Sequence, residues 1–235
     1  MNRPVAIVTG GTGGVGKALI RRLAARDFLI AATYLVPEEA HELEREPGLD
    51  EDRILLRRVD CTEPEAVEEF VAQATEAFGP VNVLTTLVGG WTGGRDVADT
   101  DDVRFERMID LNLRTSFNAA RAVIPRMEGV EWGRIIMIGS RAAIDPPAGQ
   151  AMYNVAKAGV IALARTIAQE VADRGITANV VLPSFIDTPT FRASIPYADY
   201  VDWPTPEEIA AVIDFLASEA SGVINGAMVP VYGRA

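Results

Sequence analysis

The sequence predicts an α/β protein with a single doubly wound parallel sheet of about seven strands, flanked by helices on both faces. Two observations support this prediction. Short, β-rich apolar runs alternate with longer amphipathic stretches along the chain, and no repeat or low-complexity linker interrupts them. The runs are also nearly continuous in apolar residues, which is typical of strands buried on both faces. Right-handed crossovers between such strands place helices on both faces of the sheet.

The expected strands are short apolar runs that end at turn-forming residues. The first runs directly into glycines, and the fifth reads Arg-Ile-Ile-Met-Ile-Gly. In chain order, the expected strands are residues 5–9, 28–34, 53–59, 82–88, 134–139, 177–182 and 227–231.

Amphipathic stretches between these strands predict the helices. In the first, Ala18, Leu19 and Leu23 share one face. The third has Pro64 in its first turn, where a missing N–H group costs little. In chain order, the expected helices are residues 15–26, 37–46, 64–78, 104–127, 152–173 and 206–218.

One segment breaks the alternation of strand and helix. Between the strand at 177–182 and the helix at 206–218, the chain is punctuated by Pro189, Pro196 and Pro204, and it has no clean period. A stretch of this length without regular structure is either a loose surface loop or a functional lid. We expect a substrate lid at about residues 184–205, within a single domain that covers residues 1–235.

Composition and charge exclude several classes of protein. A length of 235 residues with 49% hydrophobic content suits one domain with a sizeable core. The net charge of −11 argues against a nucleic-acid partner, which needs a basic surface. One cysteine, Cys61, and one histidine, His41, allow no intramolecular disulfide and predict no metal site. No apolar run reaches the ~18 residues of a membrane helix, and no signal peptide is recognisable, so we expect a cytoplasmic protein without a membrane partner.

A glycine-rich turn follows the first strand, at residues 9–17. Here the chain must turn tightly and let a diphosphate approach backbone N–H groups at a helix N-terminus, and side chains would block that approach. The turn is G-x-G-x-x-G through Gly11, Gly13 and Gly16, and its position between a strand and a helix favours a Rossmann-like dinucleotide site over a purely structural turn.

The choice between NAD and NADP stays open in the sequence. An acidic residue near the end of the second strand would favour NAD, and a basic residue would favour the 2′-phosphate of NADP. The candidate positions are Thr33, Tyr34 and Leu35, and none carries a charge.

Tyr153 and Lys157 are four residues apart at the start of a long predicted helix, so they share one face. A nearby ammonium stabilises a phenolate and lowers the tyrosine pKa, as acid–base catalysis requires. Taken alone, the spacing favours an ordinary amphipathic pair, because surface helices produce it by chance. Ser140, however, comes directly after the fifth strand, at the sheet edge where ligands of such folds bind. Its hydroxyl is suited to hydrogen-bond a substrate oxygen that gains negative charge.

These motifs, taken together, resemble the short-chain dehydrogenase/reductase family over essentially the whole chain. The glycine turn matches the family pattern T-G-x-x-x-G-x-G through Thr9, Gly10, Gly14 and Gly16. The resemblance implies a catalytic tetrad of Asn112, Ser140, Tyr153 and Lys157. In that tetrad Ser140 polarises the substrate oxygen, Tyr153 donates the proton, Lys157 lowers the pKa of Tyr153, and Asn112 holds a water of a proton relay.

The resemblance also implies where the dinucleotide and the substrate bind. Asp60 matches a position that touches the adenine, and Thr188 one that contacts the nicotinamide carboxamide. The implied cofactor residues are Thr9, Gly10, Thr12, Gly14, Val15, Gly16, Tyr34, Asp60, Cys61, Val88, Gly89, Tyr153, Lys157, Pro183, Ile186 and Thr188. The implied substrate residues are Trp91, Ser140, Tyr153 and Phe185.

The chain departs from the family pattern at two places. The family's asparagine-alanine-glycine after the fourth strand is replaced by residues 87–90, Leu-Val-Gly-Gly, which removes an asparagine that braces the sheet. The proline-glycine after the sixth strand is Pro183-Ser184, so the backbone there should avoid positive φ.

Two loops are also similar to those of dihydropteridine reductase, a member of the same family. They are residues 88–94, which contain Trp91, and the segment from 182 to 204. In that interpretation Trp91 forms a wall for a flat substrate; as the alternative, it only packs at the pocket rim. Two positions differ from dihydropteridine reductase as a type. That enzyme has no serine at the position of Ser140, and it has an aspartate near the position of Tyr34.

The expected reaction is therefore hydride transfer between NAD or NADP and a carbonyl or secondary alcohol of a hydrophobic or planar small molecule. The candidate pocket is aromatic, with Trp91, Phe185, Phe191, Tyr197, Tyr200 and Trp203. A dihydropteridine-type reduction of a C=N system is the alternative, and a non-catalytic dinucleotide sensor is a further one. The resemblance also implies a homo-oligomer, a dimer or tetramer, built on the helices at 104–127 and 152–173.

Overall fold

The computed structural model describes residues 3–46, 49, 52–194 and 203–234. Their strands form one seven-stranded sheet in the order β3-β2-β1-β4-β5-β6-β7, and every neighbouring pair is parallel. The order reverses between β1 and β4, so the sheet is doubly wound, as predicted. The strands are β1 (Val5–Thr9), β2 (Leu29–Tyr34), β3 (Ile54–Arg58), β4 (Val83–Thr86), β5 (Gly133–Ile138), β6 (Ile176–Pro183) and β7 (Met228–Val231).

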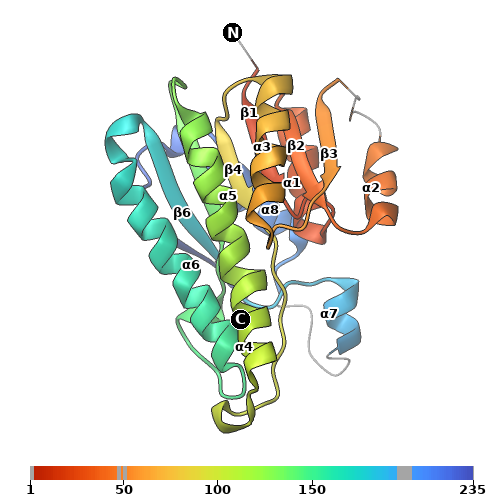
Figure 1. The fold of residues 1–235 in the computed structure, drawn as a ribbon, viewed down its shortest axis with the longest axis vertical. Helices are drawn as coiled ribbons and strands as arrows, with labels where there is room; N and C mark the ends of the chain where they lie inside the picture. The colour runs from red at the N-terminus through yellow and green to blue at the C-terminus, as the bar shows by residue number, and fades with distance from the viewer. Residues whose placement is uncertain (1–2, 47–48, 50–51, 195–202, 235) are drawn as a thin grey trace.

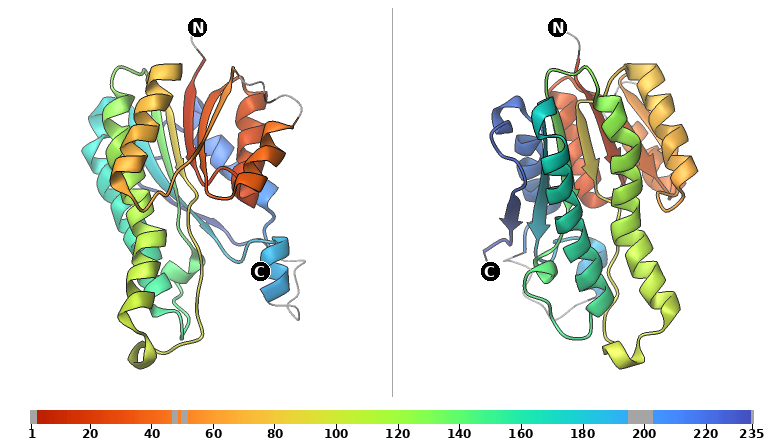
Figure 2. Two further views of the ribbon diagram at one scale, coloured as in Figure 1. Left: turned by 45° about the vertical axis from the view of Figure 1, so that its right-hand side comes forward. Right: turned by 60° about the vertical axis from the view of Figure 1, so that its left-hand side comes forward.

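Helices cover both faces of the sheet (Figures 1 and 2). One layer holds α3 (Pro64–Phe78), α5 (Thr115–Val123) and α6 (Ala151–Glu170), with α4 (Asp102–Ile109) extending α5 beyond the sheet. The opposite layer holds α1 (Gly14–Ala25), α2 (Pro37–Glu44) and α8 (Pro206–Leu216). No helix of the described residues has both the length and the apolar content that a membrane crossing requires.

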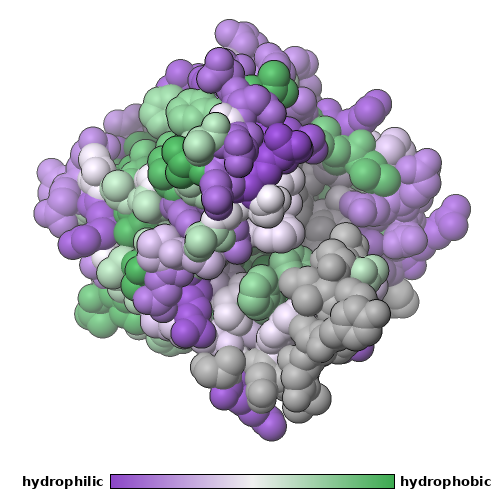
Figure 3. All heavy atoms as spheres, turned by 90° about the horizontal axis from the view of Figure 1, so that it is seen from below, coloured by the Kyte–Doolittle hydropathy of each residue, from purple (hydrophilic) through white to green (hydrophobic). Residues whose placement is uncertain are grey.

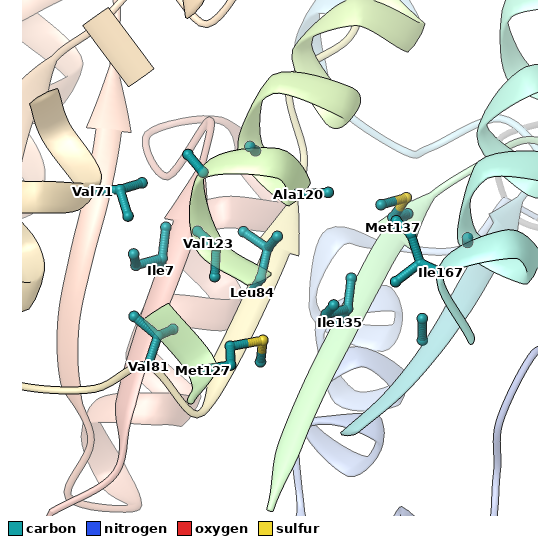
Figure 4. Close-up of a cluster of buried hydrophobic side chains, with 14 of the residues drawn as sticks. Ile7, Val71, Val81, Leu84, Ala120, Val123, Met127, Ile135, Met137 and Ile167 are labelled. Carbon is teal, nitrogen blue, oxygen red and sulfur yellow. The ribbon is translucent and has the colours of Figure 1, made fainter. Parts of the chain in front are cut away.

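Strand alternation divides the core into two clusters, one on each face. In β1, Val5 and Ile7 pack with the α3, α5 and α6 layer, whereas Ala6 and Val8 pack with the opposite layer. All four are almost fully buried, because successive strand residues point to opposite faces and both faces are covered. Figure 4 shows the first cluster, in which Ile7, Leu84 and Ile135 of the sheet meet side chains of the helices above them.

Two predicted segments differ from the structure in ways that matter for the site. The helix expected at 104–127 is present without a break in the helical backbone, but it is not α-helical throughout, because a turn of π-helix, η2 (Asp110–Arg114), joins α4 to α5 and a 3₁₀ segment (Ile124–Met127) ends it. The proposed lid contains a short helix, α7 (Pro189–Ser194), which the prolines in the sequence did not predict. Residues 195–202 of that lid lie outside the described residues.

Candidate active site

The predicted site residues gather at the end of the sheet where the strands finish. α7 follows β6 at this end, and α6 starts there, while the N-terminus lies at the opposite end (Figure 1). Figure 3 looks onto this end of the molecule, where hydrophilic surface surrounds smaller hydrophobic areas. Ligands of doubly wound sheets bind beyond this edge, near the point where the strand order reverses.

The glycine-rich turn forms a tight loop between β1 and α1. Gly10 has a φ of +72°, which favours glycine. A Cβ on Gly16 would lie 2.4 Å from the Gly10 carbonyl oxygen, so only glycine fits where α1 crosses the loop. No side chain caps the start of α1, and Gly13 and Gly14 are exposed. The first-turn N–H groups of α1 therefore face a space that an anion can enter.

Thr33, at the end of β2, holds this loop in place. Its hydroxyl accepts a hydrogen bond from the Gly10 N–H at 3.0 Å, and its carbonyl accepts one from the Gly11 N–H at 2.9 Å. The sequence analysis considered Thr33 only as a cofactor-selecting position and missed this structural role. A buried threonine at a strand end beside a glycine loop was the available signal.

Other predicted cofactor residues surround the loop. A Cβ on Gly14 would lie 3.6 Å from Thr188 Cγ2, and a Cβ on Gly10 would lie 3.1 Å from the Val88 nitrogen. Pro183 ends β6 and is buried, while Ile186 and Thr188 follow it and are partly buried. The structure therefore brings the segments after β1, β4 and β6 together, although they are far apart in sequence.

Thr188 and its neighbours start the lid. The Thr188 hydroxyl accepts a hydrogen bond from the Phe191 N–H at 3.2 Å, which leaves its own O–H available as a donor. As predicted for Ser184, the backbone has no positive φ there, since Asp27 is the only non-glycine residue with one in the described chain.

The adenine side of the predicted site lies at the ends of β2 and β3. Cys61 is buried beside Thr33, with its sulfur 3.6 Å from the Thr33 hydroxyl, and burial raises the pKa of its thiol to about 11. Asp60 is exposed, and its carboxylate accepts hydrogen bonds from the Thr62 N–H and hydroxyl. Asn118 of α5 donates to the carbonyls of Cys61 and Thr62 and so fixes this turn from the helix layer. The sequence analysis did not identify Asn118.

Ser140, Tyr153 and Lys157 form a cluster at the ends of β5 and α6. Ser140 is 7% exposed and accepts a hydrogen bond from the Ala142 N–H at 3.2 Å, and its hydroxyl lies near enough to the Tyr153 phenol to lower the pKa of that phenol. Lys157 is 3% exposed, donates to the Ile138 carbonyl at 3.0 Å, and lies with its Nζ 5.9 Å from the Tyr153 ring centre. Tyr153 and Lys157 of α6 therefore lie together beside Ser140, which follows β5, as expected.

The pKa of Tyr153 corrects one expectation. We expected Lys157 to lower it, but burial raises the pKa of Tyr153 above its ordinary value, and the nearby Ser140 hydroxyl lowers it only in part. The cause is desolvation of the phenolate, which outweighs the effect of Ser140. The Lys157 ammonium donates to the Ile138 carbonyl and lies over the tyrosine ring. Burial also lowers the pKa of Lys157, to about 8.

Asn112 lies in the π-helical turn and is fully buried. Its side-chain amide donates to the Gly90 carbonyl at 2.9 Å and accepts from the Gly90 N–H at 3.1 Å, so it binds the loop after β4 through both of its groups. A Cβ on Gly89 would lie 2.9 Å from the Asn112 side-chain oxygen and 3.2 Å from Lys157 Nζ. The extra residue of a π turn thus places Asn112 beside the loop and Lys157.

An aromatic cluster lies at the same edge, composed of Trp91, Phe185, Phe191 and Trp203. Ring centres of contacting pairs are 5.1–6.1 Å apart, within the range for favourable aromatic pairs. Trp91 is 38% exposed, and its indole N–H donates to Gln150 at 2.8 Å, just before α6. Tyr197 and Tyr200, which the sequence analysis also assigned to the pocket, lie outside the described residues.

Among the residues that the structure describes, no group of three His, Cys, Asp or Glu side chains is arranged to hold a metal ion.

Comparison with known proteins defines the class of this enzyme. A family model described as short chain dehydrogenase matches residues 4–197, and the chain belongs to this family of NAD(P)-dependent oxidoreductases, which act on carbonyl and alcohol groups.

Particular relatives match nearly the whole chain. The 3-oxoacyl-(acyl-carrier-protein) reductase MabA of Mycobacterium tuberculosis is 35% identical, over 97% of this chain and 90% of the relative. The corresponding reductase FabG of Escherichia coli is 33% identical, over 97% and 96%. Among solved structures, a short-chain dehydrogenase/reductase of Serratia marcescens has a TM-score of 0.90 and 29% identity, over 100% of this chain and 99% of that one. A structure described as ElxO with NADP bound has a TM-score of 0.90 and 25% identity, over 98% of each chain.

Proposed function

We propose that this enzyme reduces a ketone of an apolar or flat small molecule, and oxidises the corresponding secondary alcohol, with Tyr153 as the acid–base residue. The observation that carries this proposal is a cluster in which the buried Ser140 hydroxyl lies beside the partly buried Tyr153, with the buried Lys157 next to the tyrosine ring. The cluster lies at the sheet edge where ligands of this fold bind.

The glycine loop suits a dinucleotide. The cradle at Gly10, Gly14 and Gly16 excludes side chains, and the start of α1 offers uncapped N–H groups to a diphosphate. In the proposal, Thr188 and the Ile186 backbone hold the nicotinamide end, and Lys157 binds its ribose. When bound, the nicotinamide supplies or accepts the hydride.

The chain's own residues handle the proton and the substrate oxygen. Ser140 hydrogen-bonds the carbonyl oxygen, and the Tyr153 O–H donates its proton to that oxygen as negative charge develops there. Burial raises the pKa of Tyr153, so the phenol stays protonated near neutral pH, which is the form that reduction needs. With a pKa of about 8, Lys157 is largely an ammonium at pH 7 and stabilises the phenolate once the proton has left.

Asn112 is assigned a positioning role in this proposal. Its side chain is committed to the Gly90 main chain and so fixes the loop that leads to Trp91. A relay water, if Asn112 holds one, would then bind its main chain rather than its amide group. This role separates Asn112 from Ser140 and Tyr153, which contact the substrate oxygen in the proposal, and from Lys157, which acts on the ribose and the phenolate.

The aromatic cluster supports an apolar or planar substrate. Trp91 and Phe185 extend from the loops after β4 and β6, and Phe191 and Trp203 join them from the lid. Such walls bind flat or hydrophobic groups through area burial and ring contacts. The 3-oxoacyl thioesters named for the relatives contain a ketone and are one candidate.

We also propose a homo-oligomer built on the outer faces of α4, α5 and α6. Phe105, Phe117 and Val155 are large apolar side chains that these helices expose. A second copy would bury them, as the family resemblance implies. Light scattering of the purified protein tests this through its mass in solution.

The test of the proposed function is oxidation of NADH and NADPH, run in parallel, by the wild type, Tyr153→Phe and Ser140→Ala. The substrates are hydrophobic ketones, diketones, a 3-oxoacyl thioester and quinonoid dihydropterin. We expect kcat on a ketone to fall about a thousandfold in Tyr153→Phe, because the proton donor is lost, and nucleotide affinity to change little. Tyr232→Phe is the matched control, since it removes a phenol hydroxyl that the proposal does not use, and it should keep its activity.

The outcomes separate the candidate functions. Near-normal turnover in Tyr153→Phe would overturn the assignment of the proton donor. Turnover confined to the dihydropterin and insensitive to Ser140→Ala would favour reduction of a C=N system. Binding of nucleotide without turnover of any substrate would favour a dinucleotide sensor.

A further inference from the structure

The glycine-rich loop is bound to a carboxylate that comes from helix α2. The Thr12 hydroxyl donates to Glu39 Oε2 at 2.9 Å; Thr12 is buried, and Glu39 is half-buried. Glu39 lies in the first turn of α2, directly after the segment that follows β2. A negative charge is thereby held against the loop that suits the diphosphate.

This carboxylate lies where a ribose-binding acid is expected, but on a different element. In dinucleotide-binding folds an Asp or Glu about 20 residues beyond the glycine motif hydrogen-bonds the ribose 2′-hydroxyl. The end of β2 offers only Thr33 and Tyr34, which are uncharged. Thr33 is used to hold Gly10 and Gly11, so it does not provide the charge. The Glu39 side chain extends from α2 to the glycine loop and supplies the negative charge that the end of β2 lacks.

The two cations of α1 nearest the loop are paired with carboxylates. Lys17 of α1 pairs with Glu42 at 2.8 Å, and Arg21 makes a two-point pair with Glu46 at 2.6 Å. Arg58, at the end of β3, donates to the Leu35 carbonyl at 3.2 Å. Within the loop itself, Thr12 and Gly13 provide no positive charge.

A 2′-phosphate would meet an unfavourable environment here. It carries between one and two negative charges, and like charges placed together in an interface disfavour binding. Beside Glu39 it would face a carboxylate that Thr12 holds in place, whereas a 2′-hydroxyl is a donor that a carboxylate accepts.

We propose that this enzyme selects NAD(H) over NADP(H), and that Glu39, held by Thr12, is the residue that enforces the selection. The inference deepens the proposed function, because it rests on the same dinucleotide site. It concerns the adenosine end of that site and is independent of the roles assigned to Ser140, Tyr153 and Lys157.

The experiment measures the dissociation constants of NADH and NADPH by calorimetry, with thermal melting shifts as a second readout. The variants are wild type, Glu39→Gln, Thr12→Val and Glu38→Gln. Glu38 is the matched control, because it is the adjacent exposed carboxylate in the same turn and its replacement changes the net charge equally. We expect the wild type to bind NADH at least tenfold more tightly than NADPH. Glu39→Gln should reduce this ratio of dissociation constants about tenfold, because NADPH binds more tightly to the variant. Thr12→Val should reduce the ratio less. Glu38→Gln should leave the ratio within about twofold.

Each contrary outcome has a distinct meaning. Equal or tighter binding of NADPH by the wild type would overturn the inference and leave the proposed function intact. Equal changes in Glu39→Gln and Glu38→Gln would show a general charge effect and remove Glu39 as the selecting residue. Binding of neither nucleotide would overturn the proposed function together with this inference.

Discussion

The glycine loop after β1 and the Ser140–Tyr153–Lys157 cluster after β5 lie on the same edge of the sheet, yet they are built from different parts of the chain. The loop is made of backbone, with small or absent side chains and no side-chain cap on the first N–H groups of α1. The cluster is made of buried side chains, and burial shifts the pKa values of Tyr153 and Lys157 in opposite directions. The loop therefore depends on steric fit, and the cluster depends on desolvation and hydrogen bonding.

A side chain added to the glycine loop should destabilise it by steric clash, and we expect the largest effect for Gly16→Ala. The new Cβ would lie 2.4 Å from the Gly10 oxygen and 2.6 Å from the Gly11 oxygen, both backbone atoms that cannot move aside. We expect unfolding free energy to fall by about 2–3 kcal/mol, as for overpacked cores, and nucleotide affinity to fall more than about a hundredfold. Gly13→Ala is the control for stability, because its Cβ would meet only the Gly10 oxygen at 3.5 Å, an ordinary contact. Equal losses of unfolding free energy in both variants would refute a steric origin. Denaturant titrations measure this free energy, and nucleotide titrations measure the loss of affinity in Gly16→Ala.

The cluster should instead respond to pH, through Lys157. Its pKa in the folded protein, about 8, lies below the ordinary value of 10.5, so between these pH values the unfolded chain binds more protons and stability rises with pH. Below pH 8 both states are protonated, and the cost of the buried ammonium is constant.

We expect the difference in unfolding free energy between wild type and Lys157→Met to be flat from pH 6 to 7 and to shift by up to about 3 kcal/mol in favour of the wild type by pH 10. Urea titrations of the nucleotide-free proteins across this range measure it. A difference that stays constant to pH 10 would mean that burial does not perturb Lys157.

The smallest expected effect tests how the loop is held. Thr33→Val keeps the side-chain shape but removes the acceptor of the Gly10 N–H, which should cost about 1–2 kcal/mol of stability and a few-fold in nucleotide affinity. Thr85→Val, in β4, is the control, because the buried Thr85 hydroxyl has no hydrogen-bond partner among the described residues. That substitution should be neutral or stabilising, since it removes a buried polar group without breaking a bond. Thermal melts of both variants decide between a specific hydrogen bond and general core packing.

Much of this enzyme was predictable from its sequence alone. Local patterns predict the succession of apolar strands along the chain, the glycine loop, and the positions of the serine, tyrosine and lysine. Such patterns can be recognised in a single sequence. The steric need for Gly16 and the shared face of Tyr153 and Lys157 follow from helix and loop geometry, which nearby residues determine. The doubly wound parallel sheet followed in turn, because buried strands and crossover helices permit few other arrangements.

Only the tertiary structure decided the features that depend on distant residues. The direction of the Tyr153 pKa shift depends on how deeply the phenol is buried, and the four-residue spacing from Lys157 does not encode that burial. The π turn at Asn112, its bond to Gly90 and the hold of Thr33 on the loop join segments far apart in sequence. Glu39 lies one element beyond the strand end that the motif indicates, and only the packing of α2 against the glycine loop brings its carboxylate to Thr12. Local sequence determines backbone conformation, whereas charge, burial and hydrogen bonding at a site are set by whatever the fold places beside it.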